Sequence, residues 1–342
     1  MRVRLPYVIA VTAVLGCGHR EPFAPGVYAP TQPFNAPPPT RLTLNPGEDV
    51  MPLWLPSGDI MFTAERGDRP DRDHCLAVMP GSGGAITGYS CRTPGSNDSI
   101  DVLDEAAATA SGGGRLAYVR QGSYRLPIPT VSPGVQAIVI APLANPTASH
   151  VVRDLPYFAP SSRTHWGISH LRWLDSTRLV YVGQDVSYPR PCPQCSVDTV
   201  RVGLEIATLD LAPATPVVAI VPGTDNASSV AVGASGDTIY FTRESDAVVY
   251  RHAFSSAVTD TVHDFSLDGG TVASSVAWAP DKLFVTVDGS IWLIYPLIYG
   301  NILPATPTVS YGRLAPSGDG SRFVVETRAL SASLDLWLHA LR

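Results

Sequence analysis

A short unit of strand, turn and strand recurs six times along the 342 residues of the chain. Each copy has a short apolar segment, a turn of Pro, Ser, Gly or Asp, and a second segment rich in Val, Ile, Tyr and Phe. The copies lie at 53–66, 108–121, 171–185, 230–244, 276–288 and 312–328. Such turn residues accept the backbone angles of tight hairpins, so each copy predicts a β-hairpin.

A third strand-like segment follows each hairpin, from "CLAVMP" after the first copy to "LDLWLHAL" after the last. Several copies continue into a fourth segment, such as "SHVVRDL". A four-stranded unit repeated roughly every 50 residues over 41–342 is typical of a β-propeller. Second strands such as "LVYV" are apolar at nearly every position, as expected where neighbouring blades cover both faces. We predict an all-β propeller of six blades of four antiparallel strands, with seven blades as the alternative.

The first turn, "WLPSGD", carries a specific resemblance. Together with "CLAVMPGSGG" it resembles the WD40-like repeat of TolB-type six-bladed propellers, where a "W-S-P-D-G" turn leads to an "I-Y-V-M-D" strand. The fifth and sixth copies match this turn well, whereas the second and fourth lack the aromatic residue and the third lacks the proline. We interpret the repeat-turn residues as structural: Trp54, Pro56, Gly58, Asp59, Trp278, Pro280, Asp281, Pro316, Gly318 and Asp319.

The same resemblance implies how the ring closes. Residues 41–54, "RLTLNPGEDVMPLW", resemble the outer strand of the family and the lead-in to its first blade. Arg41 to Leu44 would then pair beside the last strand, Leu334 to Leu341. Joining the two ends of the chain in this way removes an open sheet edge.

The N-terminus predicts export. Arg2 and Arg4 precede an apolar run over 5–16 that is shorter than the ~20 residues needed to span a bilayer, as in a secretory signal. The following Val14-Leu15-Gly16-Cys17 resembles the bacterial lipobox. This resemblance implies that Cys17 is lipidated and becomes the mature N-terminus; the alternative is an ordinary signal peptide with a chance cysteine.

The sequence therefore predicts three regions: a signal peptide at 1–16, a lipidated Pro-rich tether at 17–40 and a propeller domain at 41–342. Pro-rich segments are extended, so the tether would hold the domain away from the membrane. Gly18, rather than Asp, follows the cysteine, which in Gram-negative envelopes favours the outer membrane. We expect a bacterial envelope protein, lipid-anchored and facing the periplasm.

Four more cysteines suggest disulfides in an exported chain. A hairpin centred on Gly83 places Cys75 directly opposite Cys91, at a separation that a disulfide tolerates. Cys192 and Cys195 form a CxxC in a proline-rich loop, for which we favour a local disulfide. A redox pair or half of a zinc site remain the alternatives.

The sequence offers little sign of catalysis. It contains no Gly-x-Ser-x-Gly, HExxH or P-loop, and no GxGxxG in a βαβ context. A net charge of -6 without a basic stripe argues against a nucleic-acid partner.

We interpret the charged loop with Asp68, Asp71 and Asp73 as solvated rather than cation-binding. His165 and His170, five residues apart, do not share one face of a strand, so no metal is predicted. The tryptophans are interpreted as blade-packing residues: Trp166, Trp173, Trp278, Trp292 and Trp337.

Our leading hypothesis is a non-catalytic, monomeric scaffold without a cofactor, which binds a protein or ligand and is tied to the membrane by its lipid. The family resemblance implies envelope partners, including peptidoglycan-associated lipoproteins. The alternative is a propeller enzyme, a hydrolase or lyase acting on a carbohydrate or small ester at the central channel; a ligand sensor is a third possibility. Binding residues are expected on the loops at 66–74, 122–134 and 184–200.

Overall fold

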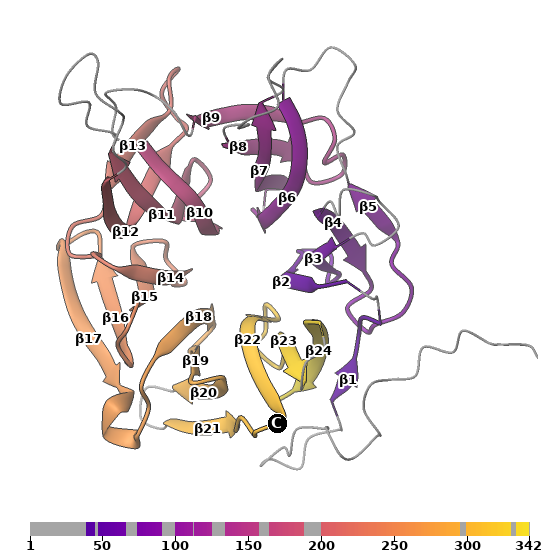
Figure 1. Ribbon diagram of the computed structural model, residues 1–342, viewed down its shortest axis with the longest axis vertical. Helices are drawn as coiled ribbons and strands as arrows, with labels where there is room; N and C mark the ends of the chain where they lie inside the picture. Colours follow the sequence, from indigo (N-terminus) through magenta and orange to yellow (C-terminus); the bar gives the residue numbers. More distant parts are fainter. Residues whose placement is uncertain are drawn as a thin grey trace, which may run out of the picture.

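The computed structural model describes residues 39–44, 47–65, 74–90, 100–111, 113–124, 134–156, 164–187, 200–294, 299–329 and 333–341. Within these ranges the strands form six blades arranged in a ring (Figure 1). The blades follow one another in chain order, and the first strand of each lies nearest the centre (Figure 1). The described residues contain no helix whose length and hydropathy would let it span a bilayer.

The first three blades take up the N-terminal half of the ring. Blade 1 contains β2 (Asp49–Trp54), β3 (Ile60–Glu65), β4 (His74–Met79) and β5 (Gly88–Ser90). Blade 2 contains β6 (Ile100–Ala110), β7 (Arg115–Tyr124), β8 (Gly134–Pro142) and β9 (His150–Pro156). Blade 3 contains β10 (Thr164–Trp173), β11 (Arg178–Ser187), β12 (Val200–Asp210) and β13 (Val217–Ile220). A single parallel pairing between β4 and β6 joins blades 1 and 2 into one sheet.

The other three blades complete the ring. Blade 4 contains β14 (Ala227–Val232), β15 (Thr238–Arg243), β16 (Val248–Ala253) and β17 (Val258–Asp264). Blade 5 contains β18 (Ala273–Ala279), β19 (Lys282–Val287), β20 (Ser290–Ile294) and β21 (Tyr299–Leu303). Blade 6 contains β22 (Val309–Pro316), β23 (Arg322–Ala329), β24 (Asp335–Ala340) and β1 (Thr40–Arg41). The one helix among the described residues is the short 3₁₀ helix Phe265–Asp268.

The six predicted hairpins are the first two strands of the six blades. Six blades of four antiparallel strands are therefore confirmed, and the alternative of seven blades is wrong. The apolar second strands have the predicted cause. In β3, for example, five of the six residues, "IMFTA", are buried, because both faces of the sheet are covered.

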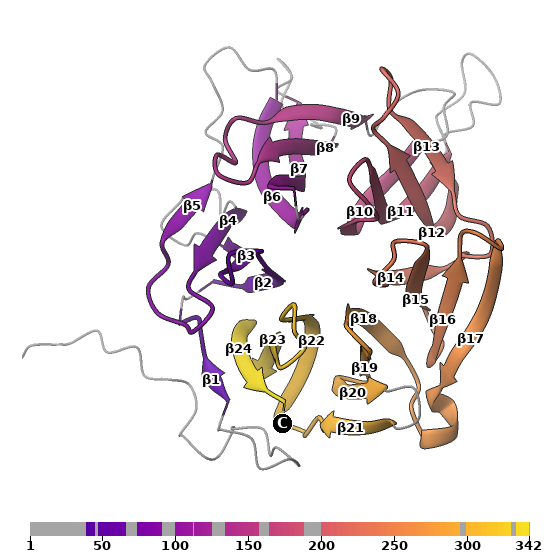
Figure 2. The same ribbon diagram turned by 180° about the vertical axis from the view of Figure 1, so that it is seen from behind.

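The ring closes as predicted, by an N-terminal strand that completes the last blade (Figure 2). Thr40 pairs with Leu338 in antiparallel register, and the N–H of Leu42 donates to the carbonyl oxygen of Leu336 at 2.8 Å. Arg41 also forms a 2.8 Å salt bridge with the buried carboxylate of Asp335. The fourth strand of blade 6 thus comes from the opposite end of the chain, which leaves no open edge between first and last blades.

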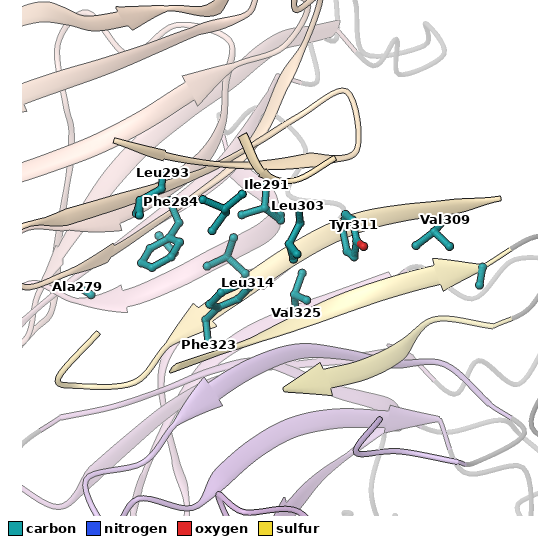
Figure 3. Close-up of a cluster of buried hydrophobic side chains, with 13 residues drawn as sticks. Ala279, Phe284, Ile291, Leu293, Leu303, Val309, Tyr311, Leu314, Phe323 and Val325 are labelled. Atoms are coloured by element: carbon teal, nitrogen blue, oxygen red, sulfur yellow. The ribbon is translucent and has the colours of Figure 1, made fainter. Parts of the chain in front are cut away.

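Apolar side chains fill the spaces between neighbouring blades. Figure 3 shows the cluster between blades 5 and 6, where Phe284 from β19 and Phe323 from β23 face each other with ring centroids 5.4 Å apart. Both rings are almost fully buried. Burial of one such side chain stabilises a fold by about 1.5–3 kcal/mol. Each blade is therefore packed on both sides against its neighbours.

Tryptophans near the ends of three inner strands connect blades 1, 3 and 5 to the preceding blade. The indole N–H of Trp54 in blade 1 donates to the carbonyl oxygen of Ala315 in blade 6 at 2.9 Å. Trp173 in blade 3 donates in the same way to Thr109 in blade 2 at 3.2 Å. Trp278 in blade 5 stacks on a tyrosine of blade 4, with ring centroids 5.0 Å apart. These contacts give the tryptophans of the repeat a packing role.

Candidate ligand site in the central channel

All six inner strands are irregular where they line the channel. Each of β2, β6, β10, β14, β18 and β22 shows a shift in register against the second strand of its blade. Such β-bulges re-aim side chains and leave backbone groups without a ladder partner. Met51 and His170 lie at two of these bulges with φ of 56° and 49°, values that residues other than glycine adopt rarely.

A cavity of about 200 Å³ lies where the inner strands end at their hairpin turns, at one mouth of the channel. We call it the mouth cavity. Every blade contributes to it through its inner strand. Figure 1 shows these six strands around the centre of the ring. Its lining residues are Pro52, Leu53, Trp54, Thr109, Ala110, Arg172, Trp173, Ala231, Val232, Ala277, Trp278, Leu314, Ala315 and Pro316.

A second, smaller space lies beside the mouth cavity. Its volume is about 10 Å³, close to what one water molecule needs. Its polar lining consists of His170, Arg172 and Arg313, which we call the channel cluster. Arg172 lines both spaces and therefore connects the cluster to the mouth cavity.

His170 is the buried histidine of the channel cluster. Burial, and then the charges of Arg313 and Arg172, lower the pKa of its imidazole well below the ordinary value of 6.5. The ring is therefore neutral at neutral pH. Its Nδ1 lies 3.2 Å from the hydroxyl oxygen of Ser169, whereas its Nε2 has no hydrogen-bond partner within the described part of the chain.

The two arginines of the cluster are close enough to influence each other. Burial, and then the charge of Arg313, lower the pKa of Arg172 to about 10, so the guanidinium stays protonated at neutral pH. Its Nη1 donates to the carbonyl oxygen of Leu171 at 2.8 Å. Among the described side chains, no carboxylate forms an ion pair with Arg172 or Arg313.

A buried glutamate lies behind the cluster. The carboxylate of Glu326 accepts hydrogen bonds from the backbone N–H groups of Met51 at 2.7 Å and Arg313 at 3.0 Å. Burial raises the pKa of Glu326, and the positive charge of Arg313 opposes that rise. Because both oxygens accept from N–H donors, the ionised form fits this site. Gly312 leaves the necessary space, since a Cβ there would lie 2.5 Å from the carboxylate.

The structure places the predicted repeat-turn residues at the edge of this site. Two of their rings, those of Trp54 and Trp278, line the mouth cavity, and so does Pro316. The three acidic residues do not line it. Asp59 accepts a hydrogen bond from a neighbouring serine at 2.8 Å, and Asp281 has the positive φ of 58° that its short turn requires.

The remaining turn residues lie beside those acids. Pro56 and Gly58 lie between β2 and β3, where Gly58 has a φ of 85°. Pro280 precedes the β19 strand, and Gly318 lies between β22 and β23. Asp319 accepts from Ser317 Oγ at 2.6 Å, and such side-chain hydrogen bonds hold its pKa well below the ordinary value. These contacts are local to each turn.

Four of the five cysteines for which we made predictions lie outside the described residues: Cys17, Cys91, Cys192 and Cys195. Cys75 is fully buried in β4. The β4–β5 register pairs Ala77 with Tyr89, as the hairpin centred on Gly83 requires. The disulfides stay predictions.

Other predicted features also lie outside the described residues. The aspartates Asp68, Asp71 and Asp73 lie outside the described residues, together with 1–38 and most of the loops at 66–74, 122–134 and 184–200. Within the described ranges, no group of three or more His, Cys, Asp or Glu side chains is placed to hold a metal ion. His165 belongs to β10, as does His170.

Sequence analysis did not single out Arg172 or Arg313, although a signal was present. Both are arginines in the last few residues of an inner strand, directly before the repeat turn. The other four copies have only uncharged residues there. Because inner strands converge on the channel, a charge at that repeat position indicates a charged channel wall.

No family model matches the sequence, and no curated protein matches it. Solved structures do match the fold. A gluconolactonase from Xanthomonas campestris has a TM-score of 0.55 at 12% identity, covering 92% of this chain and 94% of that one. The calcium-binding protein regucalcin from Agrobacterium tumefaciens has a TM-score of 0.53 at 12% identity, covering 88% and 94%. The soluble aldose sugar dehydrogenase of Escherichia coli has a TM-score of 0.51 at 11% identity, covering 87% and 97%. At such identities the likeness establishes the β-propeller fold alone.

Proposed function

We propose that the protein is a non-catalytic binding module of the bacterial cell envelope, a lipid-anchored propeller that captures a protein or small ligand at the mouth of its central channel. The observation that carries this proposal is the mouth cavity, which is lined by all six inner strands. A concave site on rigid strands is preorganised, so a ligand binds there without ordering the protein first. The predicted lipobox and tether, and the resemblance to TolB-type propellers, support the envelope location.

The size of the cavity restricts what enters it. A volume of about 200 Å³ is smaller than the roughly 300–1,000 Å³ of sites that enclose drug-sized ligands. A small molecule fits, and so does one side chain or one chain end of a protein partner. The rest of such a partner would lie on the surrounding face.

Site-specific crosslinking tests this function. A photo-reactive residue in place of Val232, which lines the cavity, should capture a partner or ligand in intact cells. The same residue in place of Val258, exposed on the outer strand β17, is the control. Filling the cavity with Ala110→Trp should abolish capture at position 232. Equal capture from both positions, or capture that survives filling, contradicts the proposal.

The second candidate is a hydrolase or lyase acting on a carbohydrate or small ester. His170 favours it, because a neutral imidazole with an unpartnered Nε2 beside two arginines can accept a hydrogen bond from a substrate hydroxyl or a water while the arginines hold an anion. Gluconolactonase and aldose sugar dehydrogenase are enzymes by name, which makes sugar lactones and aldoses the first substrates to assay. Turnover that His170→Gln abolishes without unfolding would favour this candidate over the binding module.

A further inference from the structure

The channel cluster leaves positive charge without a matching negative charge. Arg172 and Arg313, both half-buried, lie near each other in the wall of the channel, and no described carboxylate forms an ion pair with either. Like charges in a poorly solvated place repel each other strongly. Such a pair persists at less cost when an anion joins it.

The charge of the cluster indicates the valence of that anion. The two guanidinium groups are positive, the imidazole of His170 is neutral, and Glu326 behind them supplies one negative charge. One net positive charge remains. A monovalent anion balances it, whereas a divalent phosphate would reverse the sign of a buried site.

The geometry indicates where the anion enters. Of the three residues in the channel cluster, Arg172 is the one that also lines the mouth cavity, so it is reached from the mouth. Its neighbours in the cavity wall include the apolar Leu53, Val232 and Leu314. An anionic group with a small apolar body therefore fits, and guanidinium groups bind planar carboxylates in a forked geometry.

We infer that the mouth cavity binds a monovalent carboxylate, held by Arg172 with Arg313 behind it, while the unpartnered Nε2 of His170 lies at the inner end of the site. The inference deepens the proposed binding function and rests on it. The carboxylate belongs either to a small organic acid or to a side chain or C-terminus of a protein partner. Both sources present the same group to the arginines.

His170 reports on this site. The charged groups that act on it are Arg172 and Arg313, with Glu326 beyond them. A carboxylate bound to Arg172 offsets the repulsion between the arginines and the protonated imidazole, so the pKa of His170 rises when the site is filled. His252 provides a control, because burial lowers its pKa too, but its Nδ1 lies 2.8 Å from Thr259 in the outer part of blade 4.

The experiment is a histidine NMR titration of the whole folded domain with sodium benzoate, with neutral benzamide as the isosteric control. Benzoate should raise the pKa of His170 and leave that of His252 unchanged, and benzamide should change neither. No change at His170 under saturating benzoate, or the same change with benzamide, overturns the inference. Tighter binding of inorganic phosphate than of benzoate overturns the assignment to a monovalent anion.

Variants of Arg172 test whether this arginine binds the carboxylate. Arg172→Gln should weaken benzoate binding about tenfold or more, because charge-assisted hydrogen bonds are lost, and Arg172→Lys should recover part of it. The variant removes one of two repelling charges, so the fold is expected to survive. Arg251→Gln, at an exposed arginine paired with Asp260, should change nothing. Unaltered binding by Arg172→Gln refutes the role of this residue.

Peptides separate the two sources of the carboxylate. Gly-Gly-Phe binding tighter than benzoate, with its C-terminal amide inactive, identifies the chain end of a protein partner; the reverse order identifies a small organic acid. Failure of all carboxylates overturns this inference while capture through position 232 still stands. Loss of capture at 232 with carboxylate binding intact instead overturns the scaffold proposal.

Discussion

The carboxylate of Glu326 in the last blade accepts a hydrogen bond from the backbone N–H of Met51 in the first, at 2.7 Å and across 275 positions of sequence. Its other oxygen accepts from the N–H of Arg313 at 3.0 Å. Bulges free these two N–H groups from the sheet ladder, and a buried N–H needs an acceptor. One side chain therefore satisfies the irregular backbone of two neighbouring blades.

Replacing Glu326 tests this contact. Glu326→Ala leaves two buried N–H groups without an acceptor and should lower the free energy of unfolding by about 2–4 kcal/mol. Glu326→Gln keeps one acceptor oxygen and should cost less. Urea denaturation measures both. Glu244→Ala, at an exposed glutamate, is the control and should stay within about 0.5 kcal/mol of the parent. Equal effects at the two positions would contradict the assignment.

The indole hydrogen bonds between blades make a second prediction. Trp54→Phe and Trp173→Phe each remove an N–H donor to the preceding blade and should lose about 1 kcal/mol beyond the effect of the smaller ring. Trp278→Phe measures that ring effect, because Trp278 contacts blade 4 by stacking on Tyr240. Denaturation of the three variants gives the difference. Equal losses in all three would mean that the hydrogen bonds contribute nothing.

The blade pattern was readable from the sequence because a strand covered on both faces is apolar throughout and its hairpin turn has few acceptable residue types. The fourth strand of blade 5, Tyr299–Leu303, was not identified. It is a short outer strand whose first three residues are not buried, so it lacks that signal. Closure by Arg41 to Leu44 is predicted only through the resemblance, since the closing strand, observed at Thr40–Arg41, has two residues and carries no periodicity.

The channel was beyond sequence reasoning for a different reason. His170 and Arg172 of β10 meet Arg313 of β22 only because the inner strands of blades 3 and 6 converge on one axis, and no spacing along the chain encodes that. The sequence does not reveal the bulges either. Met51 at one of them has a positive φ, although methionine has no preference for that conformation. The sequence does show that Arg172 and Arg313 are charged at a repeat position where the other four copies are uncharged. This indicates that the two residues are unusual, but not which residues they contact.

Buried histidines predict acid sensitivity. Burial lowers the pKa of His339 to about 3 from the ordinary value of 6.5. Between about pH 6.5 and 3, His339 is therefore protonated in the unfolded chain but neutral in the folded protein. The free energy of unfolding falls as the pH drops through this range. Between those limits each such histidine costs about 1.4 kcal/mol per pH unit. His339→Phe should flatten the decline in unfolding free energy; an unchanged slope would contradict the prediction.

The proposed lipid anchor depends on one side chain. Cys17→Ser should prevent lipidation and move the protein from the membrane fraction to the soluble fraction of the envelope, since the lipid on Cys17 is the predicted attachment. Fractionation of cells followed by mass spectrometry of the N-terminal peptide measures both effects. Cys75→Ser, a change inside the folded domain, should leave membrane attachment intact. Membrane association that survives Cys17→Ser would refute the anchor.

Ring closure yields the last prediction. Deleting residues from Leu334 onward removes β24, and with it the partner of both β23 and β1. Blade 6 then loses two of its four strands, and its contact with blade 1 opens, so we expect a lower melting temperature and a less cooperative transition. Leu336→Ala probes the same strand gently: this leucine is fully buried, and its truncation should cost about 2–5 kcal/mol. Circular dichroism on heating measures both variants. A deletion variant that melts at the unchanged temperature would show that the five remaining blades hold the ring without its closing strand.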